Sequence, residues 1–153
     1  MGTRVARYRC PEARVTFSLL PDFLASRLSG TLDEVEQVVC VVEASRSVEA
    51  AADVLRPDIE LPGAMRWVRR RLSPIGEALV VIATLVPGTL PSTRKLRLVR
   101  AHLATEHALM DLRALADKHL AGIRWPLGLR PPESGGGPRG GRRQHETGTD
   151  RGG

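Results

Sequence analysis

The fold is decided by residues 31–72, whose sequence is TLDEVEQVVCVVEASRSVEAAADVLRPDIELPGAMRWVRRRL. Thr31 and Glu34 have the spacing of a capping box, in which each side chain accepts a hydrogen bond from the other residue's backbone amide. After this cap, valines recur every three or four residues, which is the period of an α-helix. β-Branched residues are poor helix formers, so a strand is the alternative, but the cap and the period together favour a helix.

Two further helices are expected in the same stretch. Ser47 is placed to cap the second helix, which should end just before Pro57. A turn of about eight residues follows. The third helix is expected to begin near Ala64 and to end at Ser73-Pro74, because proline removes a helical hydrogen bond. The expected order is therefore a helix, a short helix, a turn and a basic helix. Helix-turn-helix domains have this order.

Arginines mark the third helix as a candidate reader of DNA. Spacings of three and four residues place Arg66, Arg69 and Arg70 on one face, and Arg71 adds charge at its rim. The second helix of a helix-turn-helix motif lies in the major groove, where arginine can bond guanine bidentately. In this chain that helix would be the third helix of the stretch. The sequence therefore predicts double-stranded DNA as the partner. The alternative is an ordinary three-helix segment whose arginines form a solvated face.

The rest of the chain is expected to add mainly helices. Residues 4–20 contain two short strand-like pieces around a turn, which predicts a hairpin, and a short helical turn is expected over 23–28. Residues 75–86 are apolar nearly all round and predict a buried or self-associating helix. Residues 91–123 predict one long helix. Residues 131–153 are too poor in apolar side chains to pack and are expected to be disordered.

These elements predict a mainly α protein made of four parts. The parts are a degenerate zinc-ribbon-like hairpin (1–22), a helix-turn-helix domain (23–73), a helical extension (74–130) and a disordered tail (131–153). The formal net charge of +6 favours polyanionic partners. Aromatic residues make up only 3% of the chain, which argues against a single-strand binder that stacks bases on aromatic platforms.

A second basic group stands at the start of the expected long helix. It consists of Arg94, Lys95, Arg97 and Arg100, although the amino end of a helix favours anions. Phosphate would compensate for this placement, and Arg94, Lys95 and Arg97 are the predicted phosphate contacts. The alternative is a tolerated surface cluster offset by Glu106 and Asp111.

Neither a metal site nor a catalytic site is expected. Cys10 is followed by Pro11, but Ala13 stands where a zinc knuckle would have its second thiolate, so no metal is predicted. Cys40 lies in an apolar helix and should pack as a small hydrophobe. The chain contains no nucleophile elbow, phosphate-binding glycine loop or His-Glu-x-x-His motif, so we expect no enzyme activity and no cofactor.

Two segments resemble a bacterial family of transposase-associated proteins that is often described as a domain of unknown function. They are YRCP (8–11) and TFSLLPDF (16–23), and region 35–72, with its RWVRRR sequence, looks like the family's helix-turn-helix. The resemblance covers residues 5–72 and implies a zinc ribbon, a helix-turn-helix and DNA binding connected with mobile elements. This chain departs from the family at Ala13 and lacks the first cysteine pair, so Cys10 would be a remnant ligand of a lost ribbon metal.

Two alternatives to DNA binding stay open. One is a protein-interaction module that forms a homo-oligomer through the apolar segment Leu79–Val86, which is too short to span a bilayer. The other is a decayed transposase fragment without a selected function, as the incomplete zinc ligands suggest. In each case we expect a cytoplasmic protein without membrane contact, since no signal peptide is apparent.

Overall fold

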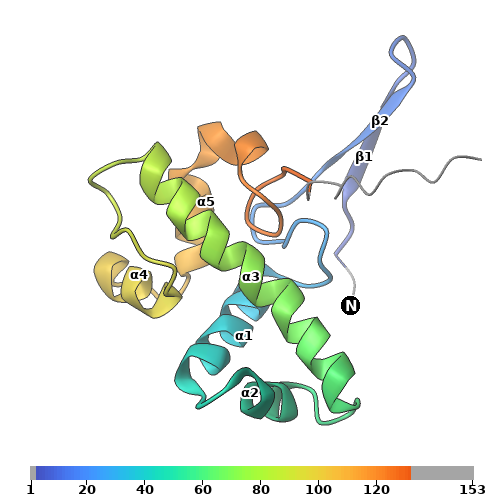
Figure 1. The fold of residues 1–153 in the computed structure, drawn as a ribbon. Coiled ribbons are helices and arrows are strands. Elements are labelled where there is room, and N and C mark those ends of the chain that lie inside the picture. Colours follow the sequence, from blue (N-terminus) through green and yellow to red (C-terminus); the bar gives the residue numbers. More distant parts are fainter. Residues whose placement is uncertain (1–2, 132–153) are drawn as a thin grey trace, which may run out of the picture.

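The structure, a computed structural model, describes residues 3–131 and is mainly helical, as expected (Figure 1). The expected tail falls, apart from its first residue, outside the described residues. The elements are β1 (Ala6–Cys10), β2 (Val15–Leu19), α1 (Leu32–Ala44), α2 (Val48–Leu55), α3 (Leu61–Leu85), α4 (Leu96–Leu103), α5 (Ala108–Leu115) and the 3-10 helix η1 (Asp117–Gly122). The antiparallel pairing of β1 with β2 confirms the hairpin.

Local capping signals were sufficient to predict where α1 and α2 begin. The Glu34 backbone amide donates to Thr31 Oγ1 at 3.1 Å, and the Thr31 amide donates to Glu34 Oε2 at 2.6 Å. The Ser47 hydroxyl accepts a hydrogen bond from the Ala50 amide at 3.1 Å. These bonds satisfy amides that the first turn of a helix leaves without partners.

The expected end of the third helix at Ser73-Pro74 is wrong. Helix α3 is continuous over 25 residues, from Leu61 to Leu85, and contains Pro74 in its interior. Pro74 and the following Ile75 are buried, so packing of this part of the helix outweighs the hydrogen bond that proline removes. Because α3 also begins earlier than expected, the turn after α2 shortens to residues 56–60.

The single long helix expected over 91–123 is also wrong, because the chain breaks into α4, α5 and η1. Helix α4 ends at Ala104, which has a left-handed backbone (φ 51°). Helix α5 starts where the buried Glu36 carboxylate accepts hydrogen bonds from the amides of Ala108 (3.2 Å) and Leu109 (2.9 Å). This cap comes from α1, so nothing in the local sequence signals it.

One main core joins the helices that we expected to form separate parts. It contains buried side chains of α1, α3, α4, α5 and the loop after η1. The domain boundary that we expected at residue 73 lies inside α3 and does not separate two units. A smaller cluster between α2 and α3 contains Ala52, Ala64 and Val68. The large side chains of the main core that are completely buried are Leu32, Ile82, Leu96, Leu109, Leu112, Ile123 and Leu127.

A buried arginine organises the segment over 23–28, which is a loop and not the expected helical turn. Arg113 of α5 is 6% exposed. Its guanidinium donates to carbonyl oxygens of the loop before α1 and of the loop after η1. Each of these four hydrogen bonds is 2.6 to 2.8 Å long, and the acceptors are Asp22, Leu24, Pro126 and Leu127. The network ties the loop before α1 to the loop after η1. Within residues 3–131, no helix has the length and apolar character needed to cross a membrane.

Candidate nucleic-acid interface

The first half of α3 carries an exposed arginine face, which we define as Arg66, Arg69 and Arg70. Their spacing along a continuous helix directs the three side chains to one side. No ion pair found within residues 3–131 involves any of them. The three guanidinium groups are exposed to solvent next to the turn that joins α2 to α3, and Glu49 of α2 interacts electrostatically with Arg69 without forming an ion pair.

Arg71 lies apart from this face, in the protein interior. It is only 8% exposed, and its guanidinium carbon lies 3.9 Å from the centroid of the Trp67 ring. Its Nη1 donates to the Trp67 carbonyl oxygen at 3.3 Å, and burial lowers its pKa. Arg56 approaches the same ring at 5.2 Å. Arg71 was expected at the rim of the reading face, but its position is that of a packing residue.

The second basic group lies beside the same helix. Arg94 and Lys95 are exposed and line a groove of about 520 Å³ together with Ser73 and Gly76 of α3. A Cβ added at Gly76 would lie 3.7 Å from the Arg94 Cβ, so the loop before α4 packs directly on α3. Ser73 follows Arg69 and Arg70 by one helical turn. The two basic groups, distant in sequence, therefore occupy neighbouring positions along α3.

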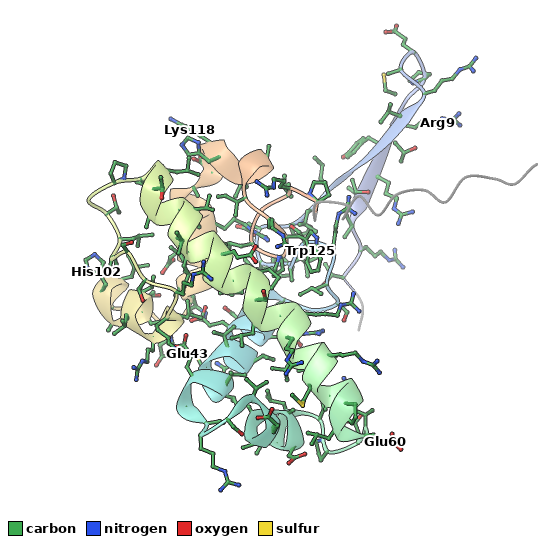
Figure 2. The ribbon with its side chains drawn as sticks, viewed as in Figure 1. Arg9, Glu43, Glu60, His102, Lys118 and Trp125 are labelled. Atoms are coloured by element: carbon green, nitrogen blue, oxygen red, sulfur yellow. The ribbon has the colours of Figure 1, made fainter. Side chains whose placement is uncertain are left out.

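A carboxylate that sequence reasoning missed sits inside this second group. Glu43 of α1 accepts hydrogen bonds from the backbone amides of Leu96 and Arg97, both at 2.8 Å, and so caps α4 (Figure 2). Glu43 therefore satisfies the amino end of that helix, and the positions of the basic residues there do not require phosphate to explain them. The Arg97 side chain remains exposed. Glu43 follows Glu36 by two helical turns, so the sequence indicates that both carboxylates lie on one face of α1. The amide of Leu96 that Glu43 caps is 53 residues away, so the sequence does not indicate this contact.

Cys10 and Cys40 lie in separate surroundings. Cys10 ends β1 opposite Val15, and the residues described contain no group of three or more His, Cys, Asp or Glu side chains placed to hold a metal. Cys40 is half-buried and accepts a hydrogen bond from Arg100 Nη1 at 2.9 Å, while burial raises the pKa of its thiol. Arg100 Nε also lies 3.1 Å from Glu36 Oε1, an ion pair without hydrogen-bond geometry.

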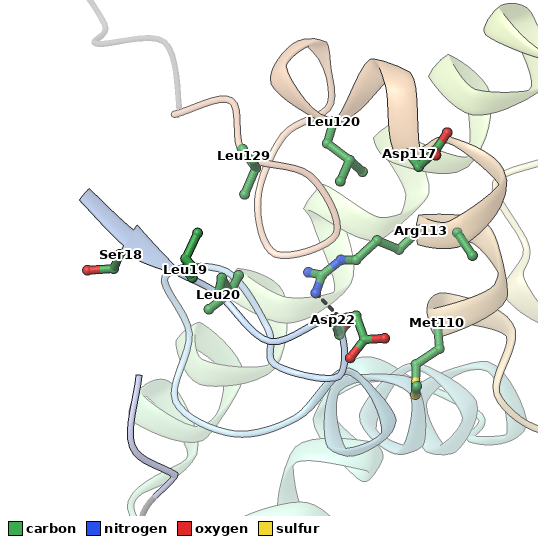
Figure 3. Close-up of a pocket in the computed structure, with 10 residues that line it drawn as sticks. Ser18, Leu19, Leu20, Asp22, Met110, Arg113, Asp117, Leu120 and Leu129 are labelled. Atoms are coloured by element: carbon green, nitrogen blue, oxygen red, sulfur yellow. Dashed lines mark hydrogen bonds between the residues drawn. The ribbon is translucent and has the colours of Figure 1, made fainter. Parts of the chain in front are cut away.

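A separate cavity of about 570 Å³ lies between the base of the hairpin and α5 (Figure 3). Its wall is mostly apolar, with Leu19, Leu20 and Leu129 among the lining residues. Arg113 points across it toward the backbone of Asp22, and the guanidinium donors are taken up by loop carbonyls. Arg113 therefore holds the fold together at this cavity, whose other charged lining residues are Asp22 and Asp117.

The segment predicted for self-association, Leu79–Val86, contributes two buried side chains to the main core, Leu79 and Ile82. Val81 and Leu85 of the same segment are 37% and 38% exposed. The segment is therefore part of the core on one side, and its apolar side chains on the other side reach solvent.

No family model, no curated protein and no solved structure matches this chain. The function of these residues is therefore inferred from their geometry and charge.

Proposed function

We propose that this protein is a non-catalytic, double-stranded DNA-binding protein of the cytoplasm that is associated with mobile elements. The observation that carries the proposal is the exposed, unpaired arginine face of α3, which follows the capped helix α2 and the turn at 56–60. A short turn between two packed helices, with cations on the outer side of the second, is the arrangement that a helix-turn-helix uses to bind DNA.

In this proposal the first half of α3 enters the major groove, which is about 12 Å wide and accepts an α-helix. Arg66, Arg69 and Arg70 would contact guanine edges or phosphates, and α2 would cross the backbone above them. Arg94 and Lys95 lie further along α3, beside Gly76, where they would contact phosphates that flank the groove. One helix would thus position both basic groups on one duplex.

The proposed link to mobile elements rests on the resemblance of residues 5–72 to transposase-associated proteins. The hairpin and helices α1 to α3 cover that region. A DNA-binding protein of this kind would recognise a site in the DNA of such an element.

Salt dependence of binding tests the proposal. Fluorescence anisotropy with a random duplex should give an affinity that falls steeply as salt is raised. Contacts to four to six phosphates predict a slope of log affinity against log salt of about −4 to −5. An absence of binding at low salt would contradict the proposal, and a slope near zero would show that the arginines do not contact phosphates.

A further inference from the structure

The β1–β2 hairpin has one basic and hydroxyl-rich face. In its register, Arg7 is opposite Ser18 and Arg9 is opposite Thr16. Side chains alternate between the two faces of a strand, so these four residues lie on the same face. All four are exposed. Two arginines and two hydroxyl groups thus form a compact polar patch, which we call the hairpin basic face.

The opposite face of the hairpin is apolar. Ala6 is opposite Leu19, and Cys10 is opposite Val15, with Tyr8 between them. Tyr8, Val15 and Leu19 are each at least half exposed. Leu19, at the base of this face, lines the cavity against α5, and beyond this base the hairpin stands out from the helical body as an arm (Figure 1).

The arginines of the hairpin are not neutralised by the fold. Within the part of the chain that the structure describes, no ion pair involves Arg7, Arg9 or Arg14, the last of which lies in the hairpin turn. Glu12 in the same turn is the one carboxylate of the segment from 4 to 20. Figure 2 shows Arg9 near the outer end of the arm, away from the helices.

Duplex DNA has the chemistry and the dimensions that this arm fits. The major groove admits a two-stranded β-ribbon. Residues two apart on a strand are about 6.6 Å apart, because the rise is about 3.3 Å per residue. DNA has one phosphate per roughly 3.4 Å of axis on each strand, so Arg7 and Arg9 can each reach a different phosphate. Hydroxyl side chains such as Thr16 and Ser18 also bond phosphate oxygens.

We propose that the hairpin is a second DNA-contacting element, in which Arg7 and Arg9 bind phosphates of a segment that α3 does not reach. This inference rests on the proposed function of α3 as the first element. It assigns to the zinc-ribbon-like hairpin a role that needs no metal. It also predicts that the protected stretch of DNA is longer than α3 alone can cover.

The experiment compares variants of the full chain on one duplex of about 30 base pairs, by anisotropy over a salt series and by hydroxyl-radical footprinting. Arg7→Ala with Arg9→Ala should make the salt slope shallower by about 2, since each phosphate contact contributes about 0.9. The footprint should shorten at one end. Arg9→Ala alone should lower affinity more than Lys118→Ala, which removes one exposed charge from η1. Arg7→Lys with Arg9→Lys should keep the slope.

The outcomes separate this inference from the proposed function. If Arg7→Ala with Arg9→Ala leaves slope and footprint unchanged while replacing Arg66, Arg69 and Arg70 abolishes binding, the hairpin role is wrong and α3 remains the DNA-binding element. If Arg9→Ala and Lys118→Ala weaken binding equally, net charge explains the effect and the hairpin role is also wrong. If the unmodified protein binds no duplex, the proposed function itself fails.

Discussion

The Arg71 guanidinium is stacked on Trp67, with 3.9 Å between its central carbon and the centroid of the ring. Arg66 and Arg70, on the same helix, are exposed to solvent. Neighbouring arginines of α3 therefore have two different roles. Arg71 packs α3 in place, whereas Arg66 and Arg70, with Arg69, are available to a ligand.

This difference predicts that two alanine substitutions will change the free energy of unfolding by unequal amounts. Arg71→Ala removes the stacking contact and buried aliphatic packing, so the free energy of unfolding should fall by about 1–3 kcal/mol. Arg66→Ala should change it by less than about 0.5 kcal/mol, because exposed side chains contribute little. Urea denaturation of the two variants measures both values. Equal effects of the two substitutions would show that the stacking does not stabilise α3.

Glu43 links stability to charge at the second basic group. Glu43→Gln weakens the cap on the amides of Leu96 and Arg97, which should cost about 1–2 kcal/mol of unfolding free energy. The same change removes a negative charge beside Arg94 and Lys95, so DNA affinity at low salt should rise about twofold. Glu106→Gln, at an exposed site in the loop between α4 and α5, is the matched control, since Glu106 caps neither helix, and it should change each of the two quantities less. Lower DNA affinity for Glu43→Gln would count against a phosphate role for this group.

The pair His107 and Asp33 predicts a dependence of stability on pH. His107 Nδ1 lies 3.0 Å from Asp33 Oδ1, and this hydrogen bond and the carboxylate charge raise the pKa of His107. A proton held more tightly in the folded state stabilises the fold below the unfolded pKa of about 6.5, and this stabilisation is lost as pH rises through the folded pKa. Asp33→Asn should therefore lower the urea midpoint more at pH 5.5 than at pH 8.5.

The control for this prediction is the same substitution in a His107→Ala background. There the loss caused by Asp33→Asn should no longer depend on pH, because the titrating partner is gone. An NMR titration of His107 in the unmodified protein checks the direction of the pKa shift. A pKa at or below the usual histidine value would rule the pair out as the source of the pH dependence.

The elements that the sequence predicted correctly are those with local signals. The capping box at Thr31 and the cap at Ser47 fix the starts of α1 and α2 through residues only three positions away. Strand-like residues around a turn likewise predicted the hairpin. In these cases the local preference agrees with the final fold, which is the condition under which pattern reasoning succeeds.

The remaining errors have causes that lie far away in the sequence. Pro74 continues α3 because its segment is buried against the core, and tertiary packing overrides helix propensity. The expected helix over 91–123 breaks where carboxylates from α1, Glu43 and Glu36, cap α4 and α5. For the candidate site, the spacing of Arg66, Arg69 and Arg70 was readable. The burial of Arg71 was not, because it depends on the packing around Trp67.

DNA binding by α3 is tested first by the contribution of its arginine face to DNA affinity. Anisotropy with a random duplex over a salt series would compare the unmodified protein with Arg66, Arg69 and Arg70 changed together to alanine, and with the same three changed to lysine. We expect the alanine variant to fold normally by circular dichroism and to have a salt slope shallower by about 2 to 3, while the lysine variant keeps the slope. If the alanine variant is folded and binds as tightly as the unmodified protein, α3 is not the DNA-binding element.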